Sequence, residues 1–298
     1  MKLDLITGGD SKYFNLINEL CESLDRLKDK NIKISILDGG LSSEQVNFFQ
    51  SKNINVIDPG WPNTEAEAKA GNKKFLRVEL AKANLDRIFP NAEYLFWVDA
   101  DAWFQNTTAL DIVRVVIKKN KLAIVSQASR LQSRHMSVKK IFGPLYLLKN
   151  ILYKNASKAK LPRKIINQLI CRPTLNAGIF AIAKNAPHWD RLRYWQQILI
   201  KDNRISLFTT TQLALGIISY HEELGYEALP EICNYMGPYR WSTDLNLFVD
   251  YYAPYEVVSI IHMVAQDEMR DNRKHRIKII DERDKIIERS LRYSENIN

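Results

Sequence analysis

The sequence predicts an α/β fold with a mostly parallel sheet in a single domain. In its first 127 residues, apolar segments of strand length alternate with segments whose apolar positions recur at helical spacing. This alternation is typical of parallel sheets with crossover helices. The chain has 298 residues, of which 46% are hydrophobic, so one large core can be buried without disulfides or structural metals.

The first half of the chain supplies most of the predicted elements. A helix with a capping box formed by Ser42 and Gln45 is expected after the second strand. The other predicted helices carry one apolar face each. We expect strands at residues 3–7, 32–38, 54–58, 93–98 and 122–127, and helices at 13–27, 73–89 and about 108–119.

The second half is less regular. Residues 176–182 and 256–263 predict strands, and the latter ends at His262. Residues 187–201 and 209–220 predict helices. Residues 266–298 form a tail with many charges of both signs, which predicts a surface helix.

Charge is unevenly distributed along the chain. The net charge is +9, yet from Ile112 to Trp189 there is no Asp or Glu and there are sixteen Lys and Arg. The remainder therefore holds 43 − 16 = 27 basic and 34 acidic residues, a net charge of −7. Within the basic section we expect a partly apolar insertion at about residues 130–172.

Cysteine usage and hydropathy bear on the compartment. The three cysteines, Cys21, Cys171 and Cys233, are scattered, which favours a reducing compartment over a disulfide framework or a zinc site. The first residues, MKLDLITGGD, are too short an apolar run for a signal peptide. No run of about 18 apolar residues occurs. We therefore expect a cytoplasmic protein.

The stretch EYLFWVDADAWF, residues 93–104, places Asp99 and Asp101 directly after an apolar run. Ligands of open α/β sheets bind beyond the carboxyl ends of the strands. Residues i and i+2 of an extended segment point the same way, and two close carboxylates repel unless a cation lies between them. A hard divalent metal is the simplest occupant. The alternative is that Asp simply ends a strand, since one D-x-D is expected by chance about once in such a chain.

Two further features follow predicted strands. Gly8 and Gly9, in TGGDSKY, permit close approach of the backbone to a ligand at the start of a helix, although such a turn is also common without function. His262 ends the last strand, where it is either a structural histidine or, with the two aspartates, part of a set that suits manganese.

The segments LITGGDSKYF, ISILDGGLSSE, KFLRVELA, YLFWVDADAWF, LNAGIFAI, TTTQLAL and IIHM occur in this order. Together they resemble GT-A-fold glycosyltransferases, most of all glycosyltransferase family eight. The resemblance covers about residues 2–265. It implies a GT-A-type domain at residues 1–265 with a Rossmann-like nucleotide-binding sheet.

The resemblance also implies site residues. Mn²⁺, with Mg²⁺ as the alternative, would be bound by Asp99, Asp101 and His262, and Gln212 would lie beside the anomeric carbon of the sugar. The two aspartates and Gln212 would form the catalytic set. The UDP-sugar donor would contact Thr7, Gly8, Gly9, Asp10, Tyr13, Arg77, Asn176, Ala177 and Gly178.

The implied activity is retaining transfer of a hexose from a UDP-sugar to a saccharide or lipid-linked glycan, in surface polysaccharide or lipopolysaccharide synthesis. The sequence departs from the family at Thr211, where an acidic residue is usual, and after His262, where a lysine is usual and only Arg270 or Lys274 is near. These departures leave two alternatives open, an inactive glycosyltransferase-like module and a sugar nucleotidyltransferase. The acidic remainder and the absence of a binding motif argue against nucleic acid as a partner.

Residues 138–170 interleave apolar residues with eight Lys and Arg and no acid. This composition predicts contact with an anionic membrane surface, peripherally on the cytoplasmic face. The alternative is a solvated basic lobe that packs on the acidic remainder.

Overall fold

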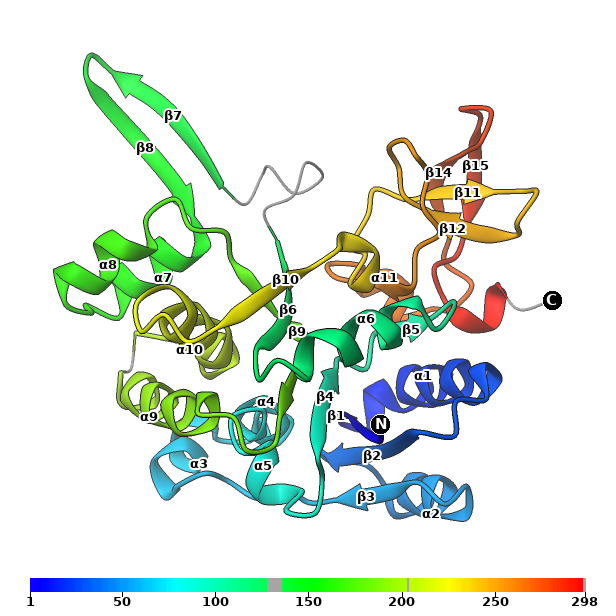
Figure 1. Ribbon diagram of the computed structural model, residues 1–298, viewed down its shortest axis with the longest axis horizontal. Helices are drawn as coiled ribbons and strands as arrows, with labels where there is room; N and C mark the ends of the chain where they lie inside the picture. Colours follow the sequence, from blue (N-terminus) through cyan, green and yellow to red (C-terminus); the bar gives the residue numbers. More distant parts are fainter. Residues whose placement is uncertain (128–135, 203, 297–298) are drawn as a thin grey trace.

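The computed structural model describes residues 1–127, 136–202 and 204–296; of residues 136, 137, 139 and 145–149 it describes the backbone alone. A seven-stranded sheet forms the centre of the molecule (Figure 1). Its strands, in spatial order, are β10 (Tyr226–Leu229), β6 (Leu122–Ser126), β9 (Leu175–Ala183), β4 (Tyr94–Val98), β1 (Leu3–Gly9), β2 (Ile32–Asp38) and β3 (Asn55–Ile57).

The sheet is parallel except at β9, which runs antiparallel to both of its neighbours, β4 and β6. The mostly parallel sheet predicted from the sequence is therefore confirmed. All nine residues of β9 are buried, as expected for a strand in the middle of a covered sheet.

Alternate residues of the strands serve two cores. In β4, Leu95 and Trp97 face one core while Phe96 and Val98 face the other. Both faces of the sheet are thus covered by helices, which gives three layers. The first face carries α4 (Leu76–Ala81), α5 (Leu85–Ile88), α7 (Ile151–Lys158), α8 (Arg163–Leu169), α9 (His188–Lys201) and α10 (Thr210–Tyr220); the second carries α1 (Phe14–Leu27) and α6 (Thr108–Ile117).

Two short helices complete the first half. The second helix, α2 (Ser43–Ser51), begins with the predicted capping box, in which Ser42 and Gln45 satisfy each other's backbone N–H groups. Helix α3 (Thr64–Ala70) begins after Asn63, whose side chain accepts a hydrogen bond from the N–H of Ala66. The helix predicted at 73–89 is divided into α4 and α5.

The prediction of a helical tail is wrong. After α11 (Asp267–Asp271) the chain forms a hairpin, β14 (Ile277–Asp281) and β15 (Ile286–Arg289), which joins β11 (Arg240–Ser242) and β12 (Leu247–Val249) in a four-stranded sheet. The apolar alternation of IKIID fits a strand as well as a helix, and pairing with β11 decides between them. The Arg292 guanidinium forms a buried ion pair with Glu19 of α1 at 2.6 Å, so the tail is fixed to the domain.

Two two-stranded sheets remain. The first pairs β13 (Ile260–His262) with β5 (Ala102–Phe104). The second pairs β7 (Met136–Phe142) with β8 (Leu145–Asn150), and this hairpin projects from the body (Figure 1). It occupies part of the insertion predicted at residues 130–172; positions 130–135 of that prediction lie outside the described residues. No helix in the described part of the chain is long and apolar enough to cross a bilayer.

Candidate metal and donor site

Asp99 and Asp101 follow β4 at the carboxyl edge of the sheet, as predicted. The backbone N–H of Asp99 donates to the carbonyl of Gly178 in β9 at 2.7 Å. The N–H of Ala102 donates to the carbonyl of Asp99 at 3.1 Å, so the segment turns at once. A turn therefore brings the two carboxylates together, and the extended segment expected from the sequence is absent because the chain leaves the sheet to form β5.

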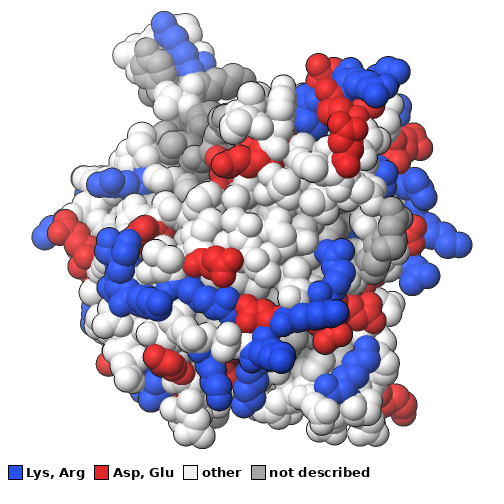
Figure 2. All heavy atoms as spheres, turned by 45° about the vertical axis from the view of Figure 1, so that its right-hand side comes forward, with Lys and Arg blue, Asp and Glu red and all other residues white. Residues whose placement is uncertain are grey.

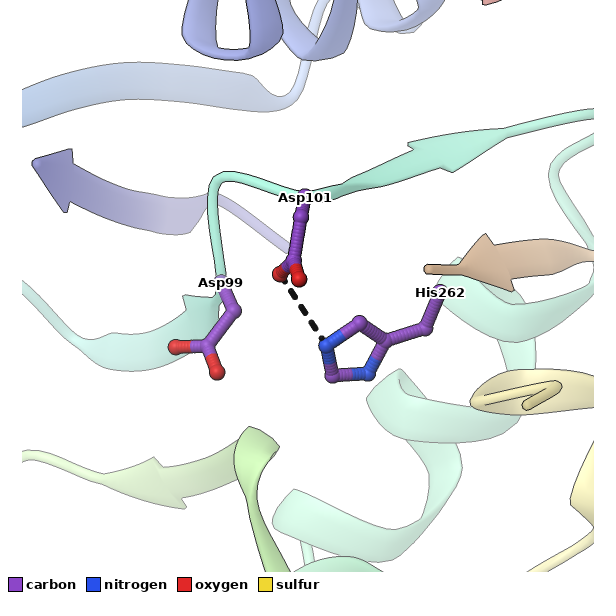
Figure 3. A group of neighbouring side chains, drawn as sticks. All are labelled: Asp99, Asp101 and His262. Carbon is purple, nitrogen blue, oxygen red and sulfur yellow. Dashed lines mark hydrogen bonds and ion pairs between the residues drawn. The ribbon is translucent and has the colours of Figure 1, made fainter. Parts of the chain in front are cut away.

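His262 reaches the same place through strand pairing. Strand β13 pairs antiparallel with β5, and His262 lies opposite Ala102 in this register. One ligand atom each from Asp99, Asp101 and His262 lies within 4.8 Å of the others (Figure 3). The structure thus brings the three predicted metal ligands together, although 161 positions separate Asp101 from His262.

The histidine ring is held in a defined orientation. Its Nδ1 donates a hydrogen bond to the Oδ1 atom of Asn234 at 2.7 Å, so Nε2 is the ring nitrogen that faces the cluster. That Nε2 faces Asp101 Oδ1 at 3.2 Å. Such an outer partner on the second ring nitrogen is typical of histidines that bind metals. No local sequence pattern points to Asn234, because this residue reaches the site only through the bridge between Tyr235 and Ile261.

A buried lysine fixes one oxygen of Asp99. Lys82 Nζ and Trp97 Nε1 donate to Asp99 Oδ1 at 2.9 and 2.7 Å. Lys82 also lies 2.6 Å from Glu79, and its side chain is only 4% exposed. The hydrogen bonds and ion pairs of Asp99's carboxylate with described residues all fall on Oδ1, so Oδ2 remains for a ligand. Sequence reasoning missed Lys82 and Glu79; the available signal was a lysine four residues after Val78 on the apolar face of the predicted helix.

The charges of this cluster are strongly coupled. Burial would raise the pKa of Asp101, but His262 and Arg270 outweigh it and hold the pKa below its usual range. Burial opposes the charge of Lys82, but the neighbouring Asp99 and Glu79 raise its pKa. Burial raises the pKa of Glu79 to about 7, against the attraction of Lys82 and with a contribution from Asp99. Asp101 and Lys82 are therefore charged at neutral pH.

The residues present fit a divalent cation. Two carboxylates and an imidazole form a ligand set that suits Mn²⁺, and opposite ligands of such an ion lie roughly 4 Å apart. Gly178 keeps the space clear, since a Cβ there would lie 2.7 Å from Asp99 Oδ2 and 2.6 Å from His262 Cε1. These distances are too short for any side chain, so glycine is required beside the ligands.

The start of β9 lines this space, as the resemblance implied for Asn176, Ala177 and Gly178. The Asn176 Oδ1 atom accepts a hydrogen bond from the Gly178 N–H at 2.7 Å. The carbonyl of Ala177 lies 3.4 Å from Lys82 Nζ. All three residues thus contact the metal cluster or its immediate partners.

The loop after β1 contains the other predicted donor residues. Gly8 and Gly9 have no room for a side chain, since a Cβ would lie 2.6 Å from the Leu37 carbonyl oxygen and 2.9 Å from Tyr13 Cβ, respectively. Close packing is therefore sufficient to explain why glycine occupies both positions. Thr7 is fully buried, and its hydroxyl has no hydrogen-bond partner in the described part of the chain. Asp10 accepts a hydrogen bond from the Lys12 N–H at 3.1 Å and starts the turn Ser11–Tyr13.

Arg270 links this loop to the metal cluster. Its Nη1 donates to the Tyr13 hydroxyl at 3.0 Å and lies 3.6 Å from Asp101 Oδ2. Lys274, the other residue considered for this role, is exposed. The structure therefore selects Arg270 as the cation beside the site, although it lies eight positions after His262 in the sequence.

Two predicted residues lie apart from the metal cluster. Arg77 donates to the Asp38 carbonyl at 2.8 Å and to Asp58 Oδ2 at 2.9 Å, beside the ends of β2 and β3. Gln212, in the first turn of α10, lies with its Nε2 3.3 Å from Oε1 of Gln127, just after β6. Neither side chain has a contact with the Asp99, Asp101 and His262 side chains among the described interactions.

Thr211, where an acidic residue is usual in the resembled family, packs against helix α4. Its hydroxyl donates to the Glu79 carbonyl at 3.2 Å. The carboxylate of the same Glu79 binds Lys82 at 2.6 Å. Helix α10, which carries Gln212, is therefore connected to the buried charges beside Asp99.

Two solved structures that resemble this chain in fold are described as glycosyltransferases. The bifunctional glycosyltransferase WbbM aligns with a TM-score of 0.50 and 12% identity over 89% of this chain and 46% of that one. The glycosyltransferase GlyE from Streptococcus pneumoniae TIGR4 aligns with a TM-score of 0.56 and 14% identity over 99% of this chain and 60% of that one. This chain thus spans about half the length of those proteins. No curated protein sequence matches.

The match to a family model is more specific. The model of the galactosyl transferase GMA12/MNN10 family matches residues 42–228, more than half of the chain. This segment includes Asp99, Asp101 and the Asn176–Gly178 stretch. The resemblance to GT-A-fold glycosyltransferases is confirmed in fold and in enzyme class. The chain belongs to the galactosyl transferase GMA12/MNN10 family and is a glycosyltransferase of the GT-A type.

Proposed function

We propose that the protein transfers a hexose from a UDP-sugar to a saccharide or lipid-linked glycan in a metal-dependent reaction. The observation that carries the proposal is the convergence of Asp99, Asp101 and His262 at the carboxyl edge of the sheet. Mn²⁺ is the favoured ion and Mg²⁺ the alternative. The loop from Gly8 to Tyr13 adjoins this point through Arg270, which is where a nucleotide diphosphate would lie.

Each residue has a distinct task in this scheme. Asp99, Asp101 and His262 would hold the cation, which when bound stabilises the negative charge that develops on the departing UDP. Lys82 fixes Asp99 so that its Oδ2 faces the site. Arg270 adds positive charge next to Asp101, and its contact with Tyr13 keeps it there.

We propose that the transfer retains the anomeric configuration. The acceptor hydroxyl would attack from the face that the UDP leaves, and the leaving phosphate would take the proton of that hydroxyl. No dedicated base is needed, and Gln212 is suited to positioning the sugar because its amide does not titrate at ordinary pH. Support for this step comes from the family resemblance of the TTTQLAL segment.

The proposed setting is synthesis of surface polysaccharide or lipopolysaccharide at the cytoplasmic face of the membrane. The support is the charge of the section from Ile112 to Trp189, which contains no carboxylate side chain. Such a section attracts anionic, phosphate-bearing acceptors and anionic lipid.

A hydrolysis screen tests the proposal without knowledge of the acceptor. The protein is incubated with a panel of UDP-hexoses with and without Mn²⁺, and release of UDP is measured. Slow release from one donor, only with metal, is expected. Formation of a nucleotide-sugar from UTP and a sugar phosphate would instead indicate a nucleotidyltransferase. Tight UDP binding with no release from any donor, even with a mixture of glycan acceptors, would indicate an inactive module.

A further inference from the structure

The β7–β8 hairpin stands away from the rest of the molecule. Its two strands pair with each other and with no other strand in the described sheets. The turn at its end contains Gly143, with φ of +50°, followed by Pro144. Figure 1 shows this turn as an extreme point of the molecule.

The end of the hairpin exposes apolar side chains. Phe142 is 84% exposed, Val138 62% and Ile141 56%. Phe142 is the most exposed large hydrophobic residue in the described part of the chain. Three such side chains within five positions, next to an exposed Pro144, form an apolar tip that water solvates poorly.

Positive charge surrounds this tip. Lys140 is exposed between Val138 and Phe142, and Figure 2 shows basic side chains on the projection. Helices α7 and α8 at the base of the hairpin, and the turn between them, carry further exposed cations with no ion pair to any described residue: Lys154, Lys158, Lys160, Arg163 and Lys164. An apolar tip with cations behind it and no acid nearby matches the boundary between acyl chains and anionic headgroups.

We propose that the tip of the β7–β8 hairpin, Val138 to Pro144, inserts into the surface of an anionic bilayer. A lipid surface is favoured over a second copy of this chain because two such hairpins carry charge of the same sign and repel. The strands of the hairpin pair only with each other, so the unpaired backbone groups of its two edges limit insertion to the hydrated headgroup boundary, where water can satisfy them. The proposal concerns membrane contact and stands whether or not the donor is a UDP-sugar.

Vesicle co-sedimentation with the full chain tests this proposal. Binding to phosphatidylglycerol vesicles is expected to weaken with added salt and to exceed binding to phosphatidylcholine vesicles. The double variant Ile141→Ser/Phe142→Ser should bind at least about tenfold more weakly, because burial of each side chain in an apolar phase is favourable. The matched control is Ile286→Ser on β15, where an equally apolar residue is 71% exposed on the other hairpin. It should bind like the parent.

Charge variants and a depth probe complete the test. Replacement of Lys140 and Lys154 by Ser should lower binding to anionic vesicles. The side chains of Lys139 and Lys149, two more of the eight basic residues at 138–170, lie outside the described residues. An environment-sensitive dye on Phe142→Cys, in a Cys171→Ser background, should shift to the blue on vesicles. Thermal unfolding and UDP-sugar hydrolysis should match the parent for every variant.

Three results would overturn the proposal. The first is a failure of the parent protein to bind vesicles, or equal binding to neutral and anionic vesicles. The second is unchanged binding of the Ile141→Ser/Phe142→Ser variant. The third is a dimer, seen by sedimentation velocity without lipid, that the same variant dissociates, because the tip would then be an interface between two copies of the chain.

Discussion

Two pairs of aspartates lie at the same edge of the central sheet, but one pair stabilises turns and the other forms the candidate metal site. Asp38 ends β2 and Asp58 follows β3, whereas Asp99 and Asp101 follow β4. Strands β4, β1, β2 and β3 are parallel, so all four carboxylates lie at its carboxyl edge. The residue types alone do not distinguish the pairs.

The first pair is neutralised and used to build turns. Asp38 Oδ1 accepts hydrogen bonds from the Gly40 and Leu41 N–H groups at 2.7 and 2.8 Å, and the carboxylate lies 3.6 Å from Arg77. Asp58 pairs with the same guanidinium, and its side chain is 61% exposed. Arg77 and solvent therefore stabilise the negative charges of both Asp38 and Asp58.

The hydrogen-bonding capacity of the second pair is only partly used. The Asp101 side chain is 10% exposed and has His262 and Arg270 beside it. Asp99 is held through one oxygen by Lys82 and Trp97 while the other faces the gap that Gly178 leaves open. A ligand site therefore differs from a structural pair of carboxylates in one respect. Its carboxylates keep at least one oxygen without a protein partner, and that oxygen points into a space shared with the other ligands.

The largest expected difference between the pairs is in metal-dependent binding. Asp101→Asn should weaken Mn²⁺-dependent binding of UDP by about a thousandfold, roughly 4 kcal/mol, because a charged ligand is lost. Its melting temperature should fall, because His262 and Arg270 lose the buried carboxylate with which they pair. Isothermal calorimetry with and without EDTA measures the binding, with Asp58→Asn as the matched control. UDP binding of the parent that is insensitive to EDTA would refute the metal assignment.

The next largest difference is in stability. Lys82→Met removes the cation that Glu79 and Asp99 share in a buried place, so the free energy of unfolding should fall by about 3 kcal/mol. Urea unfolding followed by circular dichroism gives this value. A loss below about 1 kcal/mol would mean that the two carboxylates find other partners, and Lys82 would then not fix Asp99.

Glu79, which lies beside the second pair, is expected to make the stability of the fold depend on pH. Its folded-state pKa of about 7 lies above the ordinary value of 4.5, so the folded state binds this proton more tightly than the unfolded state. The free energy of unfolding should therefore fall as the pH rises from about 4.5 to about 7, by at most about 3 kcal/mol. Glu79→Gln should remove this slope in urea titrations at a series of pH values. An identical slope in the variant would show that Glu79 titrates normally.

The smallest effect is expected at Arg77. Arg77→Met leaves Asp38 with its turn hydrogen bonds and Asp58 in water, so the loss of stability should be about 1 kcal/mol. Urea unfolding beside Lys82→Met makes the comparison direct. Equal losses in the two variants would contradict the distinction drawn between the two pairs of aspartates.

Sequence patterns alone predict the layered α/β sheet, the capping box at Ser42 and Gln45, and the candidate ligands Asp99, Asp101 and His262. These features depend on local patterns: apolar periodicity, a four-residue cap and polar residues at strand ends. The family resemblance added the stretch from Asn176 to Gly178, which does line the site. It also implied Arg77 and Gln212, whose side chains contact residues outside the metal cluster.

Other features of the site and the fold depend on contacts between residues that are distant in the sequence. Lys82 is read as a surface residue from its type, and it is buried because Glu79 and Asp99 supply the opposite charge. Arg270 reaches Asp101 only because the chain after β13 folds back over Tyr13. The strand at Ile277–Asp281 forms because β11 offers it an edge. In each case the deciding partner is distant in the sequence, and no local pattern records which distant groups will meet.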